Sequence, residues 1–192
     1  MAQFEELTVG KLIVTGGGSV GTLANVSGLS VKHSQTGNLI QSVFTLADVA
    51  QSVINGTEYQ STLLFTFPKC FLKVQGSIAS LAQKTTSGLV STINAGATGA
   101  WSVGTAAASS TTLSFSAANF INSNAFTSST VINVAGDVVT DSLGITSITD
   151  SNSSVKSLYL NSAFATTGDI DGDGTQTFSG TIIINWLNLG SA

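Results

Sequence analysis

The sequence contains no arginine, and it has one cysteine, one proline and one histidine among its 192 residues. A single cysteine excludes an internal disulfide and any zinc site that needs two or four thiolates. The absence of arginine removes the bidentate donor that proteins use for carboxylates and phosphates. The six lysines are scattered along the chain, whereas a nucleic-acid site needs clustered positive charge to displace counterions from phosphates. We therefore expect no nucleic-acid partner.

Charge of either sign is scarce. Charged residues make up 8% of the chain and the net charge is −4, whereas soluble domains average about 25% charged residues. Hydrophobic residues reach 42%, which is enough for the chain to fold around a core. No apolar run approaches the roughly 18 residues that would span a bilayer, and the N-terminus carries no basic segment of the signal-peptide type. We expect no membrane partner, synthesis in a cytoplasm and a surface dominated by hydroxyl groups.

Side-chain alternation predicts an all-β chain. Leu63, Phe65 and Phe67 share one face of an expected strand, and Cys70, Leu72, Val74 and Ile78 share one face of the next. Further expected strands are 89–95, 100–104, 111–115, 130–134, 156–161 and 181–189. About eight strands without intervening helices favour an antiparallel β-sandwich, with a jelly-roll topology preferred to an immunoglobulin-like one.

The first 57 residues differ in pattern from the rest. Residues 1–43 are short alternating apolar stretches that end at glycines, and they are too slight to form a core of their own. This segment either adds strands to the main sheet or associates with other copies or with a partner surface. Thr45 to Asp48 matches a capping box, and the apolar spacing that follows predicts a short helix at residues 46–54. We therefore expect a Gly-rich N-terminal β arm with a helix (1–57) and a β-sandwich body (58–192).

The sequence offers no set of residues that indicates an enzyme. His33 is the only histidine and lies in the Gly-rich segment, so a Ser-His-Asp triad has no evident third member. Gly16, Gly18 and Gly21 match the spacing of a dinucleotide-binding turn, but a strand-like stretch follows where that turn requires a helix. We therefore expect a non-enzymatic protein without a cofactor.

The one acidic cluster is a candidate metal site. Asp169, Asp171 and Asp173 have the D-x-D-x-D-G spacing that brings three carboxylates to one calcium ion. The twelfth position of this loop is Gly180, where a calcium loop of the EF-hand type has a bidentate glutamate. The alternative is a solvated Asp-Gly turn that leads into the last strand. Both interpretations stay open at this point.

Trp101 and Trp186 both lie in strand-like stretches, where an aromatic side chain is more often part of the core than a platform for a sugar ring. A carbohydrate-binding tip therefore remains the less favoured interpretation. The long polar stretches 116–129 and 140–154 are expected to be loops, which is where a binding surface would lie.

Three stretches make the chain resemble the jelly-roll head decoration or cement proteins of tailed bacteriophages. They are LTVGKLIVTG near the N-terminus, GATGAWSVGTAAASSTTLS in the middle and GDIDGDGTQTFSGTIIINWLNLG at residues 168–190. The resemblance implies a virion protein on the outer surface of the head, assembled in the host cytoplasm. It further implies a homotrimer that bridges neighbouring subunits of the major capsid protein, with the N-terminal arm between them. The alternative is a tail-fibre or spike tip that binds a receptor or glycan.

Overall fold

The computed structural model describes residues 20–85, 98–127, 132–134, 149–150, 154–166, 168–170 and 172–190. Within these ranges the only helical segment is one 3-10 turn, η1 (Phe115–Ala117). The strands are β1 (Thr22–Leu23), β2 (Leu29–Thr36), β3 (Leu39–Val53), β4 (Tyr59–Thr66), β5 (Phe71–Thr85), β6 (Thr98–Gly104), β7 (Ile121–Thr127), β8 (Ile132–Val134), β9 (Thr149–Asp150), β10 (Ser157–Phe164) and β11 (Gly174–Asn188). The all-β prediction is confirmed.

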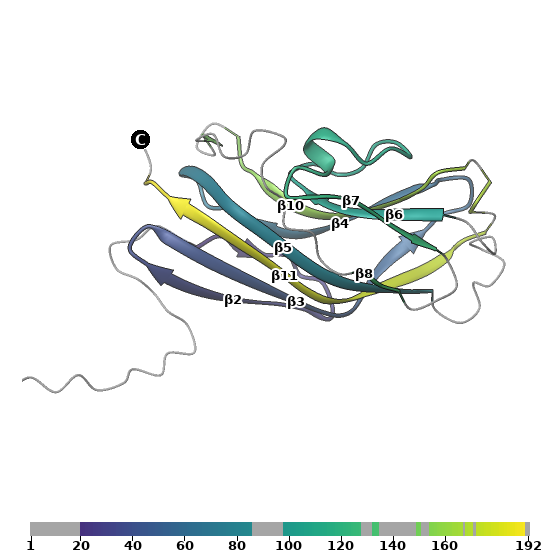
Figure 1. The fold of residues 1–192 in the computed structure, drawn as a ribbon, viewed down its shortest axis with the longest axis horizontal. Coiled ribbons are helices and arrows are strands. Elements are labelled where there is room, and N and C mark those ends of the chain that lie inside the picture. The colour runs from purple at the N-terminus through teal and green to yellow at the C-terminus, as the bar shows by residue number, and fades with distance from the viewer. Residues whose placement is uncertain are drawn as a thin grey trace, which may run out of the picture.

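The strands form two antiparallel sheets that pack face to face (Figure 1). Sheet A has the order β1-β4-β10-β6-β7, and sheet B has the order β2-β3-β11-β5-β8, with β9 also pairing with β5. The pairs β3–β11, β4–β10, β5–β8 and β6–β7 are nested in the sequence, because each pair encloses the next. One long hairpin wrapped around a core in this way is an eight-stranded jelly roll. The predicted sandwich and its topology are therefore confirmed.

The two ends of the space between the sheets are filled differently. One end holds aromatic rings: Phe67 lies 5.2 Å from Phe65 and 5.4 Å from Trp186, measured between ring centroids, and it stacks on Phe120. Edge-to-face and stacked pairs of this kind add to the stabilisation that burial provides.

The other end of the interior holds amides. Gln176 donates to Gln51 Oε1 (2.9 Å) and to Ser162 Oγ (2.7 Å), and Gln83 donates to Gln176 Oε1 (3.1 Å). All four side chains are buried. Because Ser162 lies on β10 and the glutamines lie on β3, β5 and β11, the hydrogen bonds join the two sheets and fix their relative position.

Bulges shift the side-chain alternation along the strands. An extra residue, Leu64, interrupts the pairing of β4 with β10, so Leu64 and Phe65 are both buried and Leu63 is exposed. Gln75 is the extra residue in the pairing of β5 with β11, and beyond it Ile78 points outward. A bulge moves every later side chain to the opposite face. The predictions that Leu63 shares a face with Phe65 and Phe67, and that Ile78 shares a face with Cys70, Leu72 and Val74, were therefore wrong.

The short helix predicted at residues 46–54 is also wrong, because β3 continues through this segment. Its pairing with β11 contains a bulge at Asp48, which has φ 52 and exchanges two 2.9 Å hydrogen bonds with Ser179. The bulge places two buried side chains, Leu46 and Val49, three positions apart. That spacing is the one a helix produces, and it misled the sequence prediction.

Residues 20–57 belong to the sandwich. β1 pairs with β4 in sheet A, β2 pairs with β3 in sheet B, and β3 pairs with β11 along most of its length. Of the two alternatives for the N-terminal region, this part adds strands to the main sheets. The predicted division at residue 57 therefore does not separate an arm from a body within the described residues, and residues 1–19 lie outside them.

Most of the other predicted strands have counterparts in the structure. The stretches 100–104, 156–161 and 181–189 fall on β6, β10 and β11, and 130–134 falls partly on β8. The stretch 111–115 is not a strand, because it begins with a bend at residues 111–112 and ends at Phe115, the first residue of η1. The stretch 89–95 lies outside the described residues. In the part of the chain that the structure describes, no helix has the length and hydropathy of a bilayer-spanning segment.

Candidate functional site

A loop of residues 105–119 crosses the outer face of sheet A. It connects β6 to β7, and η1 lies within it (Figure 1). Ser61, Ser102 and Asn161 point outward from sheet A beneath this loop, and Ser102 and Asn161 are nevertheless fully buried. The loop therefore covers polar side chains that would otherwise face solvent.

Asn161 on β10 is the main attachment point of the loop. Its Nδ2 donates to the carbonyls of Ala106 (3.1 Å) and Ala117 (2.8 Å), and its Oδ1 accepts from the amide of Ala108 (3.0 Å) and from Ser61 Oγ (2.7 Å). Ser102 Oγ adds a further bond to the Ala117 carbonyl (2.7 Å). One amide side chain thus uses both donor positions and accepts two hydrogen bonds, which holds both ends of the loop.

The loop backbone lies directly on strand β6. A Cβ atom added at Gly104 would stand 2.3 Å from the Ser116 carbonyl oxygen and from the Ala117 carbonyl carbon. Asn119 closes the loop, because its Oδ1 accepts from the Thr105 amide (2.9 Å) and its Nδ2 donates to Thr105 Oγ1 (2.9 Å). The loop is therefore fixed by close packing as well as by hydrogen bonds.

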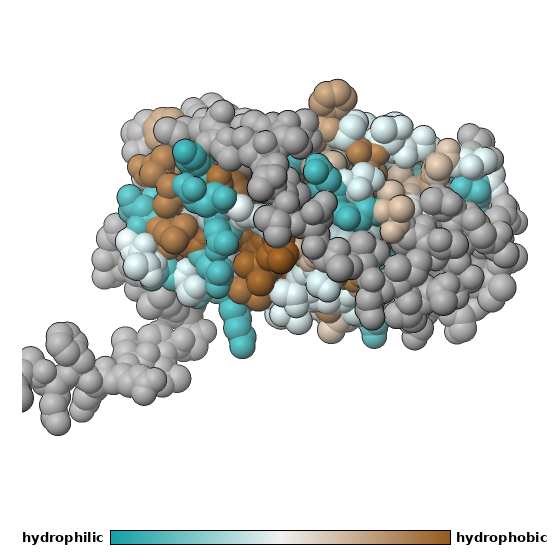
Figure 2. All heavy atoms as spheres, viewed as in Figure 1, coloured by the Kyte–Doolittle hydropathy of each residue, from teal (hydrophilic) through white to brown (hydrophobic). Residues whose placement is uncertain are grey.

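Phe115 projects from this fixed loop. Its side chain is 75% exposed, the largest value among the exposed apolar residues of the described structure. Its backbone has φ 47, a left-handed conformation that costs a residue with a side chain roughly 1–2 kcal/mol. Figure 2 shows an apolar protrusion above η1. An exposed aromatic ring held in a strained conformation by its surroundings is typical of a binding site.

The loop that carries Phe115 has no charged residue. No acidic or basic residue occurs between Lys84 and Asp137, a stretch that includes the whole loop. Its neighbours in the sequence, Ser114, Ser116 and Ala117, carry only hydroxyl and methyl groups. Such a surface fits a partner that offers an apolar pocket with a polar rim, which is the usual arrangement around an aromatic anchor in protein interfaces.

The predicted metal site is only partly described. Asp169 Oδ2 accepts from the Thr166 amide (3.1 Å), and Asp173 Oδ1 accepts from the Asn55 amide (2.9 Å). Asp171 lies outside the described residues. Both described carboxylates therefore accept backbone hydrogen bonds, and Asp173 ties the turn before β11 to the turn after β3.

A second carboxylate bond holds the same two turns together. Glu58, which is buried, accepts from the Gly168 amide (2.8 Å), and the Ile170 carbonyl accepts from the Gly56 amide (3.2 Å). Within the described ranges no group of three or more His, Cys, Asp or Glu side chains is placed to hold a metal ion. Because Asp171 lies outside the described residues, calcium binding by the three aspartates stays a prediction. A melting curve of Asp171→Ala with and without calcium distinguishes calcium binding from the plain turn.

The two tryptophans, His33 and Gly21 were also candidate site residues, and the structure packs each of them within the sandwich. Trp101 and Trp186 are both 1% exposed or less, so neither forms a platform for a sugar ring. His33 is half-buried on β2, where its Nδ1 lies 2.9 Å from Ser42 Oγ, and burial lowers its pKa. Of the glycines in the dinucleotide-like spacing, only Gly21 is described, and it packs against Phe65.

Sequence reasoning missed Phe115 as a site because its neighbours suggested a strand. The one available signal was a lone aromatic residue within a long stretch of Ser, Thr and Ala. Sequence reasoning also missed Asn161, because its role depends on a loop that passes over it. No protein-family model, curated protein or solved structure matches the chain.

Proposed function

We propose that the protein is a non-enzymatic virion structural protein that decorates the head of a tailed bacteriophage and stabilises it by bridging neighbouring subunits of the major capsid protein. The resemblance of three sequence stretches supports the phage assignment, and the jelly-roll topology is one that viral capsid proteins use. The observation that carries the proposal is the Phe115 loop, which presents a rigid, uncharged contact surface.

The low charge of the chain determines how such a contact works. With no arginine and few charged residues, ion pairs contribute little to adhesion, and apolar contacts with hydrogen bonds must supply it. We therefore expect binding to isolated heads to change less than about threefold between low and high salt, because salt screens only charge interactions. A steep loss of binding in salt would contradict the proposed contact.

The direct test is Phe115→Ser on isolated heads that lack the protein. Loss of an aromatic anchor typically costs at least about 2 kcal/mol of binding energy, or roughly 30-fold in affinity. Val155→Ser is a matched control, because Val155 is also exposed (47%) but lies in the segment before β10, outside loop residues 105–119. Equal binding by the wild type and Phe115→Ser would remove the loop from the proposal.

The N-terminal segment is tested by a truncation that leaves the sandwich intact. Removal of residues 1–43 would delete β1, β2 and part of β3, whereas removal of residues 1–19 leaves every described strand in place. If residues 1–19 reach between capsid subunits and build the expected homotrimer, this truncation lowers head binding and abolishes trimers in light scattering. If head binding and the molecular mass in solution are both unchanged, residues 1–19 contribute to neither. The proposed contact would then be made by the β-sandwich alone.

A receptor- or glycan-binding fibre tip is the second candidate. One observation favours it, since an exposed aromatic ring among hydroxyl groups also suits a sugar ring. The burial of both tryptophans counts against it. Antibody labelling of particles separates the two functions, because a fibre tip is labelled at the tail and a decoration protein on the head.

A further inference from the structure

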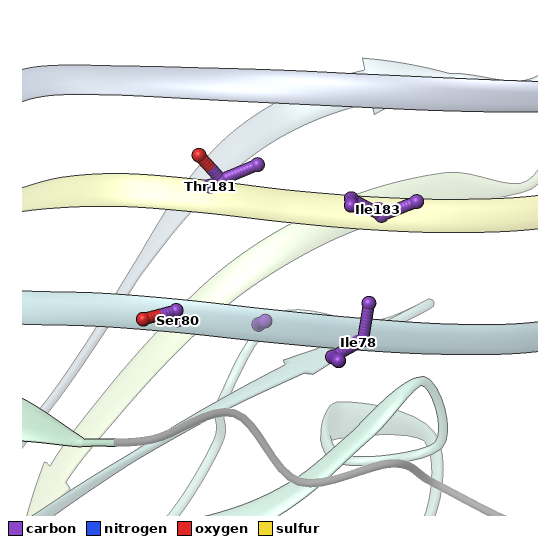
Figure 3. A pocket seen from close by; sticks show the side chains of 5 residues that line it. Ile78, Ser80, Thr181 and Ile183 are labelled. Atoms are coloured by element: carbon purple, nitrogen blue, oxygen red, sulfur yellow. The ribbon is translucent and has the colours of Figure 1, made fainter.

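Strand β2 is weakly held in comparison with the central strands of sheet B. It forms one edge of the sheet, so only β3 pairs with it, and none of its eight residues is fully buried. β11, in contrast, is paired on both sides, with β3 and with β5. Figure 3 shows the shallow groove between β5 and β11, where Ile78 and Ser80 lie beside Ile183 and Thr181. A strand with one neighbour and few buried side chains opens more easily than a central strand.

His33 gives β2 a polar link to the interior. It lies opposite Ser42 of β3, and its Nδ1 is 2.9 Å from Ser42 Oγ. The same hydroxyl accepts a 2.9 Å hydrogen bond from Trp186 Nε1 on β11. Ser42 and Trp186 are both buried, and the centroid of the His33 ring lies 5.7 Å from that of Phe65 in the other sheet. His33 is therefore the outer end of a hydrogen-bonded chain that runs across β11, β3 and β2.

The hydrogen-bonding capacity of these groups decides where the proton of the imidazole lies. An indole N–H only donates, so the Ser42 oxygen is the acceptor in that bond and its one proton remains for His33. In the part of the chain that the structure describes, the Ser42 hydroxyl has no other acceptor. Nδ1 of His33 is therefore unprotonated, and the neutral ring carries its proton on Nε2.

A second proton on the ring is incompatible with this chain. Nδ1–H would then point at the Ser42 oxygen, and the proton of the buried Ser42 hydroxyl would lose its acceptor. A buried donor without a partner destabilises the arrangement that contains it. The closed position of β2 therefore favours neutral His33.

The next inward residue of β2 adds to this sensitivity. Gln35 Nε2 donates to the Gly37 carbonyl (2.8 Å), whereas Gln35 Oε1 is buried and has no hydrogen-bond partner among the described residues. The inward face of β2 thus contains one unsatisfied acceptor even when His33 is neutral. Little additional cost is needed to open the strand.

No carboxylate faces the ring to neutralise a charge on it. Lys32 of β2 has the same sign and points to the exposed face. Asp48 of β3 is exposed at the bulge and bonds to Ser179, and Tyr59 lies at the far end of β4. β1 and β11 have no titratable side chain. Burial accordingly lowers the pKa of His33.

We propose that neutral His33 holds β2 against the sandwich, and that protonation of this ring in mild acid opens β2 while β3 and the strands beyond it stay paired. Opening separates the ring from Phe65 and leaves the backbone edge of β3 without its neighbour. The glutamine and serine side chains that join the two sheets do not titrate, so the rest of the sandwich keeps its hydrogen bonds. The inference depends on the packing of β2 and not on the proposed function.

Nitrogen NMR tests the proton position directly. The untagged chain has one histidine, so isotope-labelled histidine gives ring signals from His33 alone. At pH 8 we expect Nδ1 without a proton and Nε2 with one. Ser42→Ala removes the hydroxyl and should give two tautomers in exchange, whereas Ser34→Ala, on the exposed face of β2, should leave the wild-type signals unchanged. A proton on Nδ1 of the wild type at pH 8 would overturn the proposal.

Amide hydrogen exchange tests the opening. The ratio of the wild-type exchange rate to that of His33→Gln, whose side chain stays neutral, should be at least about twofold higher at pH 5 than at pH 8 for the amides of β2. The pH dependence of the exchange reaction itself cancels, because both proteins are compared at the same pH. The amides of β11 should show no such change.

Two results of the exchange experiment would contradict the proposal. An unchanged ratio in β2 would show that His33 does not control the strand, and an equal change in β11 would show that acid unfolds the whole sandwich. Both proteins are measured as free chains, so a failure to bind phage heads would remove the proposed function and leave this inference standing.

Discussion

The outer faces of the two sheets have opposite designs. Sheet A carries outward polar side chains, and a loop covers them and uses their hydrogen-bonding groups for its own attachment. Sheet B carries outward aliphatic side chains, of which Leu39 and Ile78 are exposed and Val43, Ile183 and Leu187 are partly buried. The polar face therefore supports a rigid projection within one molecule, whereas the apolar face keeps Leu39 and Ile78 open to solvent.

The largest expected effect is at the attachment point of the loop. Asn161→Ala leaves the amide of Ala108 and the carbonyls of Ala106 and Ala117 without their partner, which should cost roughly 2–4 kcal/mol of unfolding free energy. Chemical denaturation measures this loss. Asn55→Ala, an exposed asparagine, should change stability by less than about 0.5 kcal/mol. Equal effects at the two positions would show that the loop does not depend on Asn161.

A smaller effect of opposite sign is expected at the tip of the loop. Phe115→Gly removes an unfavourable left-handed phenylalanine and little buried area, so it should raise the unfolding free energy by up to about 1 kcal/mol. The same variant should lose head binding to the same degree as Phe115→Ser. A gain in stability together with a loss of binding would identify the strain at Phe115 as a cost of function. A large loss of stability would instead make the ring a structural residue.

Substitutions on the outer face of sheet B should change the stability of the isolated chain very little. Ile183→Thr keeps a β-branched side chain on the outer surface of a central strand and should change the unfolding free energy by less than about 0.5 kcal/mol at low protein concentration. Denaturation curves at two protein concentrations test this. If Ile183→Thr destabilises the dilute chain strongly, this face is packed within the monomer and the contrast between the sheets fails.

The smallest effect is expected at the edge strand of sheet B, where β2 turns His33 inward. Burial lowers the pKa of His33 below 6.5, so the folded chain binds a proton less readily than the unfolded chain. Neutral His33 therefore contributes fully to the stability of the folded chain above about pH 6.5. This contribution is lost as the pH falls through and below that value, because the unfolded chain then binds the proton more readily. Between pH 8 and pH 5, the wild type should lose more stability in urea unfolding than His33→Gln does. Parallel curves for the two proteins would contradict this assignment.

The sequence was sufficient to predict the fold class but not the face on which each side chain lies. The alternation of apolar residues and the scarcity of proline indicated strands, and those strands form the predicted jelly roll. Alternation fails where a strand gains one residue, as it does at Asp48, Leu64 and Gln75. A bulge has no firm sequence signature, because tertiary pairing decides which residue is extra.

The candidate site was less predictable than the fold for a related physical reason. The position of Phe115 depends on Asn161 and Ser61, which are far from it in the sequence and lie side by side under the loop because β4 and β10 pair. The stretch 111–115 has the composition of a strand, yet it belongs to a loop that lies on the outer face of sheet A and does not pair as a strand of the sheet. Long-range hydrogen bonds of this kind cannot be inferred from local pattern.

The most direct test of the central claim is a difference map, by cryo-electron microscopy, between particles that carry the protein and particles that lack it. The account predicts added density on the outer surface of the head, at the junctions between neighbouring capsid subunits, with the side of the jelly roll that bears the Phe115 loop against the shell. Density confined to the tail, or particles that are identical with and without the protein, would contradict it.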